Sequence, residues 1–227
     1  MQNETTDTSQ NETQTLEAEI REAVANGVHV QETVQRLTLQ ALNAKQVDVD
    51  YLRRIVTAAM QGIHDGASQR VQQIAGQSQA AKAQIGGAIA GLDAALAGLA
   101  QASKLAVEEA AGQAKKFSDS ELTRTRSDLE SLESLFLDSL QKTASAAQGV
   151  VADVLHELTR HAKTNGTEVG AQLKETLAVL AQQIASAGHV QVATGISLAH
   201  ATAEFVGKIA SGVLSGINEQ KKNDQSR

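Results

Sequence analysis

The middle of the chain repeats every eleven residues, as IAGQSQAAKAQ (74–84), IGGAIAGLDAA (85–95) and LAGLAQASKLA (96–106). Each unit begins with a large apolar residue and carries a glycine two positions later. The same spacing continues in both directions, and the complete apolar stripe consists of Leu52, Ile63, Ile74, Ile85, Leu96 and Val107. Eleven residues make three turns at about 3.67 residues per turn, so the stripe stays on one side of a helix.

Small residues follow the same period on the other side of that helix. The glycine face, almost opposite the stripe, consists of Gly76, Gly87 and Gly98. One interpretation is a central helix packed on both sides, because glycine and alanine let a neighbouring backbone approach closely. The other is a helix whose stripe rests on a lipid or polymer surface, which an eleven-residue repeat can follow over a long distance.

The composition supports helices and argues against other fold classes. The 227 residues include 38 alanines, no proline, no cysteine and no tryptophan. Proline normally makes up about 5% of a protein, so its absence favours long helices and argues against all-β and α/β folds. Without cysteine there is no disulfide and no thiolate metal site. The net charge of -6 provides no basic stripe for phosphates, so we expect no nucleic-acid partner.

Periodicity and end signals predict an antiparallel bundle of about four long amphipathic helices, coiled-coil-like, in one elongated domain over residues 15–218. The expected helices cover residues 15–42, 50–116, 120–163 and 168–218, with a bend at Gly188 and His189. Polar composition predicts a disordered tail over residues 1–14 and a frayed one over 219–227.

Short local signals mark the expected helix ends. Asp48 or Asp50 is the expected N-cap of the second helix, and the order of Ser118 and Glu121 fits a capping box. Gly166 suits the left-handed conformation that ends a helix, and Thr167 then begins the next one.

No motif indicates a reaction. His156 and Glu157 precede His161 in a pattern close to the zinc-protease motif, but the histidines are five apart. On a helix that spacing rotates them about 140° from a common face, so they do not form a pair of ligands. We therefore expect no enzyme activity, no catalytic residue, no cofactor and no metal.

Composition, helix length and stripes such as Ile74, Ile85 and Leu96, or Leu129, Leu132 and Phe136, resemble the phasins that coat bacterial polyester granules. The eleven-residue period is also similar to the lipid-associating repeats of apolipoproteins and to late-embryogenesis-abundant proteins, although this chain has less charge and more Leu and Ile than the latter. The phasin resemblance implies a non-catalytic granule-surface protein that self-associates.

The sequence thus predicts a non-enzymatic helical interaction or scaffold protein. It would coat a granule or lipid surface, or bind another helical protein, through its amphipathic helices, and self-associate. Because the first residues lack the basic and apolar regions of a signal peptide, we expect a cytoplasmic location, at a granule or membrane surface. The alternative is a membrane-active bundle that inserts its Gly/Ala-rich segment, residues 84–107, into a bilayer.

Overall fold

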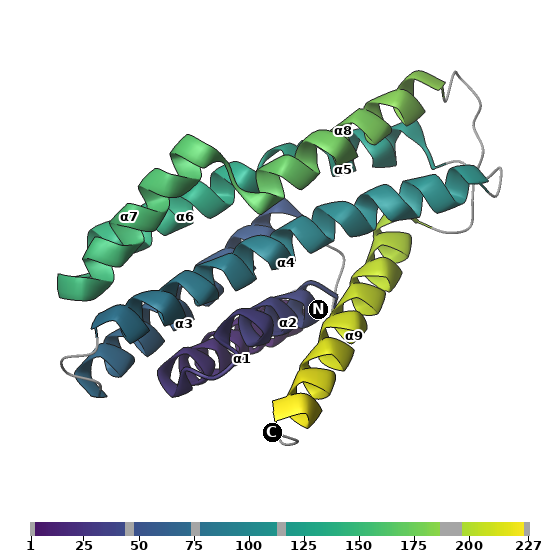
Figure 1. Cartoon of the computed structure of the whole chain (residues 1–227). Helices are drawn as coiled ribbons and strands as arrows, with labels where there is room; N and C mark the ends of the chain where they lie inside the picture. The colour runs from purple at the N-terminus through teal and green to yellow at the C-terminus, as the bar shows by residue number, and fades with distance from the viewer. Residues whose placement is uncertain (1–2, 44–47, 74–77, 113–116, 187–196, 225–227) are drawn as a thin grey trace.

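The described part of the chain is entirely helical, which confirms the predicted all-α class. A computed structural model describes residues 3–43, 48–73, 78–112, 117–186 and 197–224. Within these residues the helices are α1 (Asn3–Asn26), α2 (Val30–Asn43), α3 (Val49–Gln73), α4 (Ser78–Gly112), α5 (Asp119–Glu130), α6 (Leu132–Ala146), α7 (Gly149–Asn165), α8 (Glu168–Ser186) and α9 (Leu198–Asp224) (Figure 1).

Helix α4 lies at the centre of the molecule. Helices α2, α8 and α9 contact it most extensively, and α3 and α7 also touch it. Figure 1 shows α5–α8 along one side of α4 and α1, α2 and α9 along the other. Its interior positions include many alanines, of which Ala88, Ala95 and Ala100 are fully buried. Small side chains at these positions let several helices approach the same central helix.

The expected helix over residues 15–42 is wrong, because two helices occupy that region. Helix α1 ends at Asn26, and the turn before α2 has positive φ at Gly27 (+71°) and at His29 (+47°). Gln84 Nε2 donates a hydrogen bond to the Gly27 carbonyl at 3.4 Å. The break lets both halves turn their apolar residues inward, and Leu16, Ile20 and Val34 are all buried.

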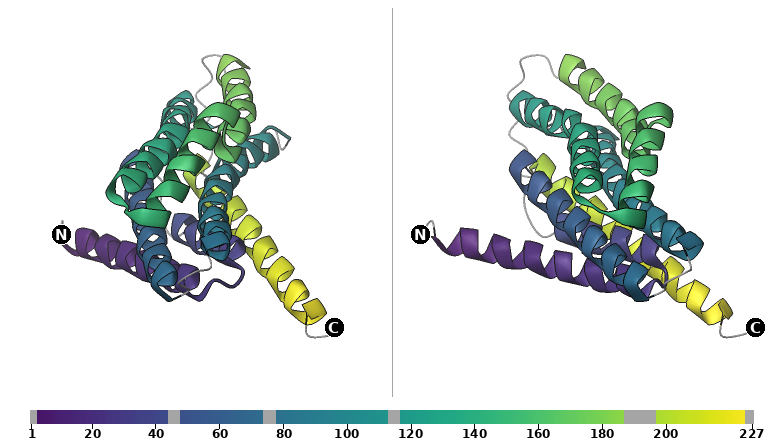
Figure 2. Two further views of the ribbon diagram at one scale, coloured as in Figure 1. Left: turned by 60° about the vertical axis from the view of Figure 1, so that its left-hand side comes forward. Right: turned by 90° about the vertical axis from the view of Figure 1, so that its left-hand side faces the viewer.

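The two polar tails are also shorter than expected. Helix α1 already begins at Asn3, and α9 continues to Asp224. Their Glu, Gln and Lys residues have good helix propensity, so a helix nucleated by the apolar residues nearby can extend into them. Figure 2 shows the outer ends of both helices extending beyond the remaining helices (Figure 2). Residues 1–2 and 225–227 lie outside the described residues.

The expected single helix over residues 50–116 is replaced by α3 and α4, which lie side by side. Arg70 Nε donates to Gln84 Oε1 at 3.1 Å. In one continuous helix these residues would be about 21 Å apart. Folding back buries apolar surface on both helices that a single rod would leave in water. Residues 74–77 and 113–116 lie outside the described residues.

The last two expected helices are divided as well, so the four-helix arrangement is wrong. Residues 120–163 form most of α5, α6 and α7, and Lys163 Nζ reaches Gln141 Oε1 at 2.9 Å across the α6–α7 pair. Residues 168–218 form α8, which packs on α4 and α5, and part of α9, which packs on α4 and α2. The expected bend at Gly188 and His189 lies outside the described residues.

Local end signals were predicted more reliably than helix lengths. Asp48 Oδ1 accepts the Tyr51 N–H at 2.8 Å, which confirms it as the N-cap of α3. The capping box of Ser118 and Glu121 is present, with both reciprocal hydrogen bonds. Gly166 has φ +86° after α7, and Thr167 Oγ1 accepts the Gly170 N–H at 2.9 Å.

Candidate functional site

The apolar stripe lies inside the molecule. Its described members have exposed fractions of 0–2%: Leu52, Ile63, Ile85, Leu96 and Val107. Ile74 lies outside the described residues. Because α3 and α4 fold back on each other, the stripe does not form one continuous face. In this closed bundle no external surface can contact it, and a partner would reach it only after helices separate.

The glycine face contacts other helices. A Cβ atom at Gly87 would lie 3.8 Å from Gln31 Cβ of α2, and one at Gly98 would lie 3.3 Å from Leu39 Cδ2 of α2 and 3.7 Å from Ile209 Cγ2 of α9. Gly91, one turn after Gly87, is even closer, because a Cβ there would collide with the Gln31 carbonyl. Gly76 lies outside the described residues. Helices α2 and α9 therefore pack against the glycine face of α4.

A second close contact, between α1 and α3, was missed from the sequence. A Cβ at Gly62 would be 2.5 Å from the Glu17 carbonyl oxygen, and one at Gly66 would be 2.5 Å from the Arg21 carbonyl oxygen. Both distances are too short for real atoms, so these positions require glycine. The signal available in the sequence was the four-residue spacing of the two glycines.

The contact of α4 with α8 is polar at its centre. Asp93 accepts two backbone N–H groups from the first turn of α8, from Glu168 to Oδ2 and from Val169 to Oδ1, both at 2.9 Å. Thr176 Oγ1 also donates to the Ala100 carbonyl at 3.1 Å, and Lys104 Nζ pairs with Glu175 Oε2 at 3.0 Å. Asp93 was not among the contact residues predicted from the sequence, although it is the only charged residue between Lys82 and Lys104.

The acidic groups at this contact are easier to protonate than free carboxyls. Burial is the main cause that raises the pKa of Asp93, and the Glu133 charge raises it further, while the two backbone hydrogen bonds lower it. Burial and the Asp93 charge raise the pKa of Glu168. Thr167 Oγ1 donates to Glu133 Oε1 at 2.7 Å, so two acidic side chains from α4 and α6 hold the start of α8.

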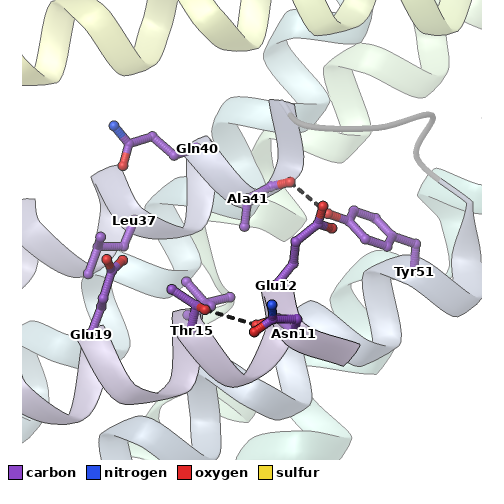
Figure 3. A pocket seen from close by; sticks show the side chains of 9 residues that line it. Asn11, Glu12, Thr15, Glu19, Leu37, Gln40, Ala41 and Tyr51 are labelled. Atoms are coloured by element: carbon purple, nitrogen blue, oxygen red, sulfur yellow. Dashed lines mark hydrogen bonds between the residues drawn. The ribbon is translucent and has the colours of Figure 1, made fainter. Parts of the chain in front are cut away.

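A hollow of about 260 Å³ lies between α1, α2 and the start of α3 (Figure 3). Tyr51 reaches across its end and donates to the Ala41 carbonyl at 2.8 Å, and Thr15 Oγ1 donates to the Asn11 carbonyl. Burial raises the pKa of Tyr51, the Glu12 charge adds to this, and Arg54 opposes it. The lining also contains Glu12, Glu19 and Gln40.

The histidines on α3 and α7 bond to groups of their own helices. In the groove between α3 and α6, His64 Nδ1 lies 2.8 Å from Asp65 Oδ1, and no hydroxyl of the lining residues is bonded to the ring. His156 lies on α7 with Nδ1 2.8 Å from the Ala152 carbonyl, while His161 contacts Asn165. Among the described residues, no three metal-binding side chains cluster closely enough to hold an ion.

The surface of the molecule is mostly polar, whereas the central helix α4 is mostly apolar. Among the residues whose side chains the structure describes (11–43, 48–73, 79–112, 117–185 and 197–212), Val28 is the one large apolar side chain that is exposed, at 66%. By length and composition, Gln79–Gly112 within α4 is the one described segment that could cross a membrane, and 67% of its apolar window is buried by the other helices. The buried apolar side chains form one core, and α4 runs through its centre.

One family model matches residues 6–223, and its description is "Family of unknown function (DUF6781)". No curated protein and no solved structure matches the chain. The matched segment contains α2 to α8 completely and nearly all of α1 and α9, so it includes the contact of Asp93 with α8.

Proposed function

Because the chain belongs to the DUF6781 family, whose function is unknown, we propose a function from its geometry: a non-enzymatic protein that coats an apolar granule or lipid surface by opening its bundle. The observation that carries this proposal is the storage of apolar side chains around α4 beneath a polar exterior. In water, burial of that surface keeps the helices together. At an apolar surface the same side chains can remain out of water without their helical neighbours.

Features of the contacts favour separation of whole helices. Many buried positions of α4 are alanine, such as Ala88, Ala95 and Ala100, and these positions bury less apolar area than leucine would. The chain has no cysteine, so no disulfide restrains the helices. Amphipathic helices released from the bundle could lie side by side with those of further copies, which is the self-association that we propose on the surface. The proposed location is the cytoplasmic face of a granule or membrane.

Adsorption to triolein droplets covered with phosphatidylcholine tests this function. We expect saturable adsorption with helix content retained, measured by droplet flotation and circular dichroism. The control is Val28→Asp, which removes the exposed apolar side chain without touching the interior. Equal adsorption of the variant supports binding through the stored surface. Absence of adsorption, or its loss in Val28→Asp alone, would contradict the proposal.

A second candidate is insertion of α4 into a bilayer, and the length and apolar composition of Gln79–Gly112 favour it. A helix of 34 residues is about 51 Å long, more than the roughly 30 Å of a hydrocarbon core. Insertion of its segment 84–107 predicts leakage of a trapped dye from phosphatidylcholine vesicles. Coating predicts adsorption to the droplets with the vesicles intact.

A further inference from the structure

Asp93 occupies an unusual place for a charged residue. It lies in the middle of the apolar helix α4, eleven residues after Lys82 and eleven before Lys104. Its side chain forms no ion pair among the described residues, and both carboxylate oxygens are used by the N–H groups of Glu168 and Val169. The carboxylate therefore supplies part of the N-terminal cap of a helix that begins 75 residues later in the chain.

The start of α8 depends on this contact. The first N–H groups of a helix have no partner inside the helix, and the positive end of its dipole favours a negative charge. Asp93 satisfies two of these groups, and Thr167 satisfies that of Gly170. A Cβ at Gly170 would meet the Glu133 carboxylate, so that side chain would have to move to make room for one. The junction is thus closely fitted around two carboxylates.

The charged groups around Asp93 come from several helices. Glu133 of α6 and Glu168 of α8 carry the same charge and lie close enough to interact with it. The ion pairs at Lys82 with Glu157 of α7, and at Lys104 with Glu175 of α8, are three turns away along α4. From α3, Arg70 bonds Gln84, while α2 and α9 contact α4 through Gln31, Leu39 and Ile209, which do not titrate.

We propose that Asp93 is the latch between α4 and α8, and that it takes up a proton when α8 leaves and α4 contacts an apolar surface. On the eleven-residue period, Asp93 lies about 65° from the apolar stripe, within the half of α4 that would face such a surface. A carboxylate placed there loses both its water and the two N–H groups of α8. The neutral acid avoids that cost.

The latch responds differently to water and to an apolar surface. In the closed bundle the pKa of Asp93 is raised, since burial outweighs the two N–H groups. If α8 separates in water, the pKa returns to its ordinary value of 3.8, so protons favour the closed form over the form open in water. On an apolar surface the pKa rises further because the N–H groups are gone. Protons therefore favour the surface-bound form over the closed form.

This inference rests on the proposed coating function, and its test compares Asp93→Asn with the matched control Asp153→Asn. Both changes remove one negative charge, and Asp153 is exposed on α7. Adsorption to the triolein droplets is measured at about pH 7.5 and about pH 5. We expect wild type and Asp153→Asn to bind more tightly at the lower pH, by up to about tenfold for each pKa unit by which the surface-bound carboxyl exceeds the closed one. Asp93→Asn should bind the droplets tightly at both pH values, because its side chain is neutral at each of them.

A second measurement follows the latch in the wild-type protein. Hydrogen exchange at the amides of Glu168 and Val169 should be slow in water and become fast on droplets, while circular dichroism in water confirms that each variant is folded. The same pH dependence in all three proteins, or amides that stay protected on droplets, would overturn the latch and leave coating intact. Absence of adsorption by every protein at both pH values would overturn the coating function and the latch together.

Discussion

Gly66 lies where helices α1 and α3 touch through their backbones. A Cβ there would be 2.5 Å from the Arg21 carbonyl oxygen and 2.8 Å from Val24 Cβ, and neither atom belongs to a flexible side-chain end. We expect Gly66→Ala to lower the free energy of unfolding by about 2 kcal/mol, because the helices must move apart. Urea denaturation measures the change.

Gly86 is the matched control, since a Cβ there meets nothing within 4 Å. Gly86→Ala should raise the free energy of unfolding by about 0.5–1 kcal/mol, because alanine loses less backbone entropy in a helix. Equal effects of the two substitutions would show that helix propensity, and not contact between α1 and α3, decides the role of Gly66.

Three carboxyls with raised pKa values give stability a defined dependence on pH. Loss of contact with water on folding is the main cause that raises the pKa of Asp93, Asp128 and Glu168 in the folded state. A folded state that binds protons more readily than the unfolded chain gains stability as pH falls. The gain from Asp93 is complete below its unfolded pKa, near 3.8, and is lost as pH rises through its raised folded value.

Asp93→Asn isolates this contribution. The asparagine oxygen still accepts one N–H of α8, but the buried charge is gone. Relative to wild type, the variant should be more stable at neutral pH than at about pH 3.5, where the wild-type carboxyl is itself largely neutral. Chemical denaturation at both pH values measures this difference, and a difference independent of pH would show that the ionised carboxylate costs nothing in the fold.

At the scale of one element, the start of α5 combines two contacts. Ser118 Oγ accepts the Glu121 N–H at 3.3 Å, and Glu121 Oε2 accepts the Ser118 N–H at 3.3 Å. Glu121 Oε1 also accepts the Leu198 N–H at the start of α9, at 3.3 Å. Ser118→Ala removes the cap and should cost about 1 kcal/mol of unfolding free energy.

Ser131 provides the comparison for this cap. It occupies the N-cap position of α6 but makes no side-chain cap hydrogen bond there. Ser131→Ala should change the unfolding free energy by less than about 0.5 kcal/mol in thermal or urea denaturation. A Ser131→Ala effect as large as that of Ser118→Ala would mean that the capping box contributes no more than an ordinary surface serine.

Helix ends and helix class could be read from the sequence because they depend on neighbouring residues. The cap at Ser118 needs only Glu121, and Gly166 needs only its own lack of a side chain. Helix lengths depend instead on what each face can be buried against. Nothing within three or four residues of Arg70 shows that Gln84 lies beside it, so a continuous helix fitted the local pattern equally well.

The residues of the candidate site were also predictable only where the signal is a local sequence pattern, and not where it is a long-range contact. The spacing of Ile85 and Leu96 revealed an apolar stripe, but not that the other helices cover it. The local sequence does not reveal the role of Asp93, because its two partners, Glu168 and Val169, are 75 and 76 residues away. A contact of that sequence separation leaves no periodic signal, although a single charge inside an apolar segment was a visible indication.

At the scale of the whole molecule, α4 has two different sides. Toward α8 its contacts include Asp93, Lys104 and the Ala100 carbonyl, whereas toward α2 and α9 they involve the bare glycine face. If the bundle opens at the contact of Asp93 with α8, then α8 separates from α4 while α2 remains packed against α4. We call this opening by halves. Tyr51 is the single tyrosine of a chain without tryptophan, and it bonds the Ala41 carbonyl of α2. Its fluorescence therefore reports on the part of the bundle that contains α2, which is expected to stay closed.

A disulfide between α2 and α4 tests opening by halves. A Cβ at Gly87 would lie 3.8 Å from Gln31 Cβ, the usual separation in a disulfide, and the natural chain has no cysteine to compete. Oxidised Gln31→Cys/Gly87→Cys should gain up to about 4 kcal/mol against unfolding, as closing a loop of this length predicts. Its adsorption to droplets and its tyrosine fluorescence should equal those of the reduced form, because α8 can still leave. Adsorption that is lost on oxidation and restored by a reductant would instead show that α2 must separate from α4.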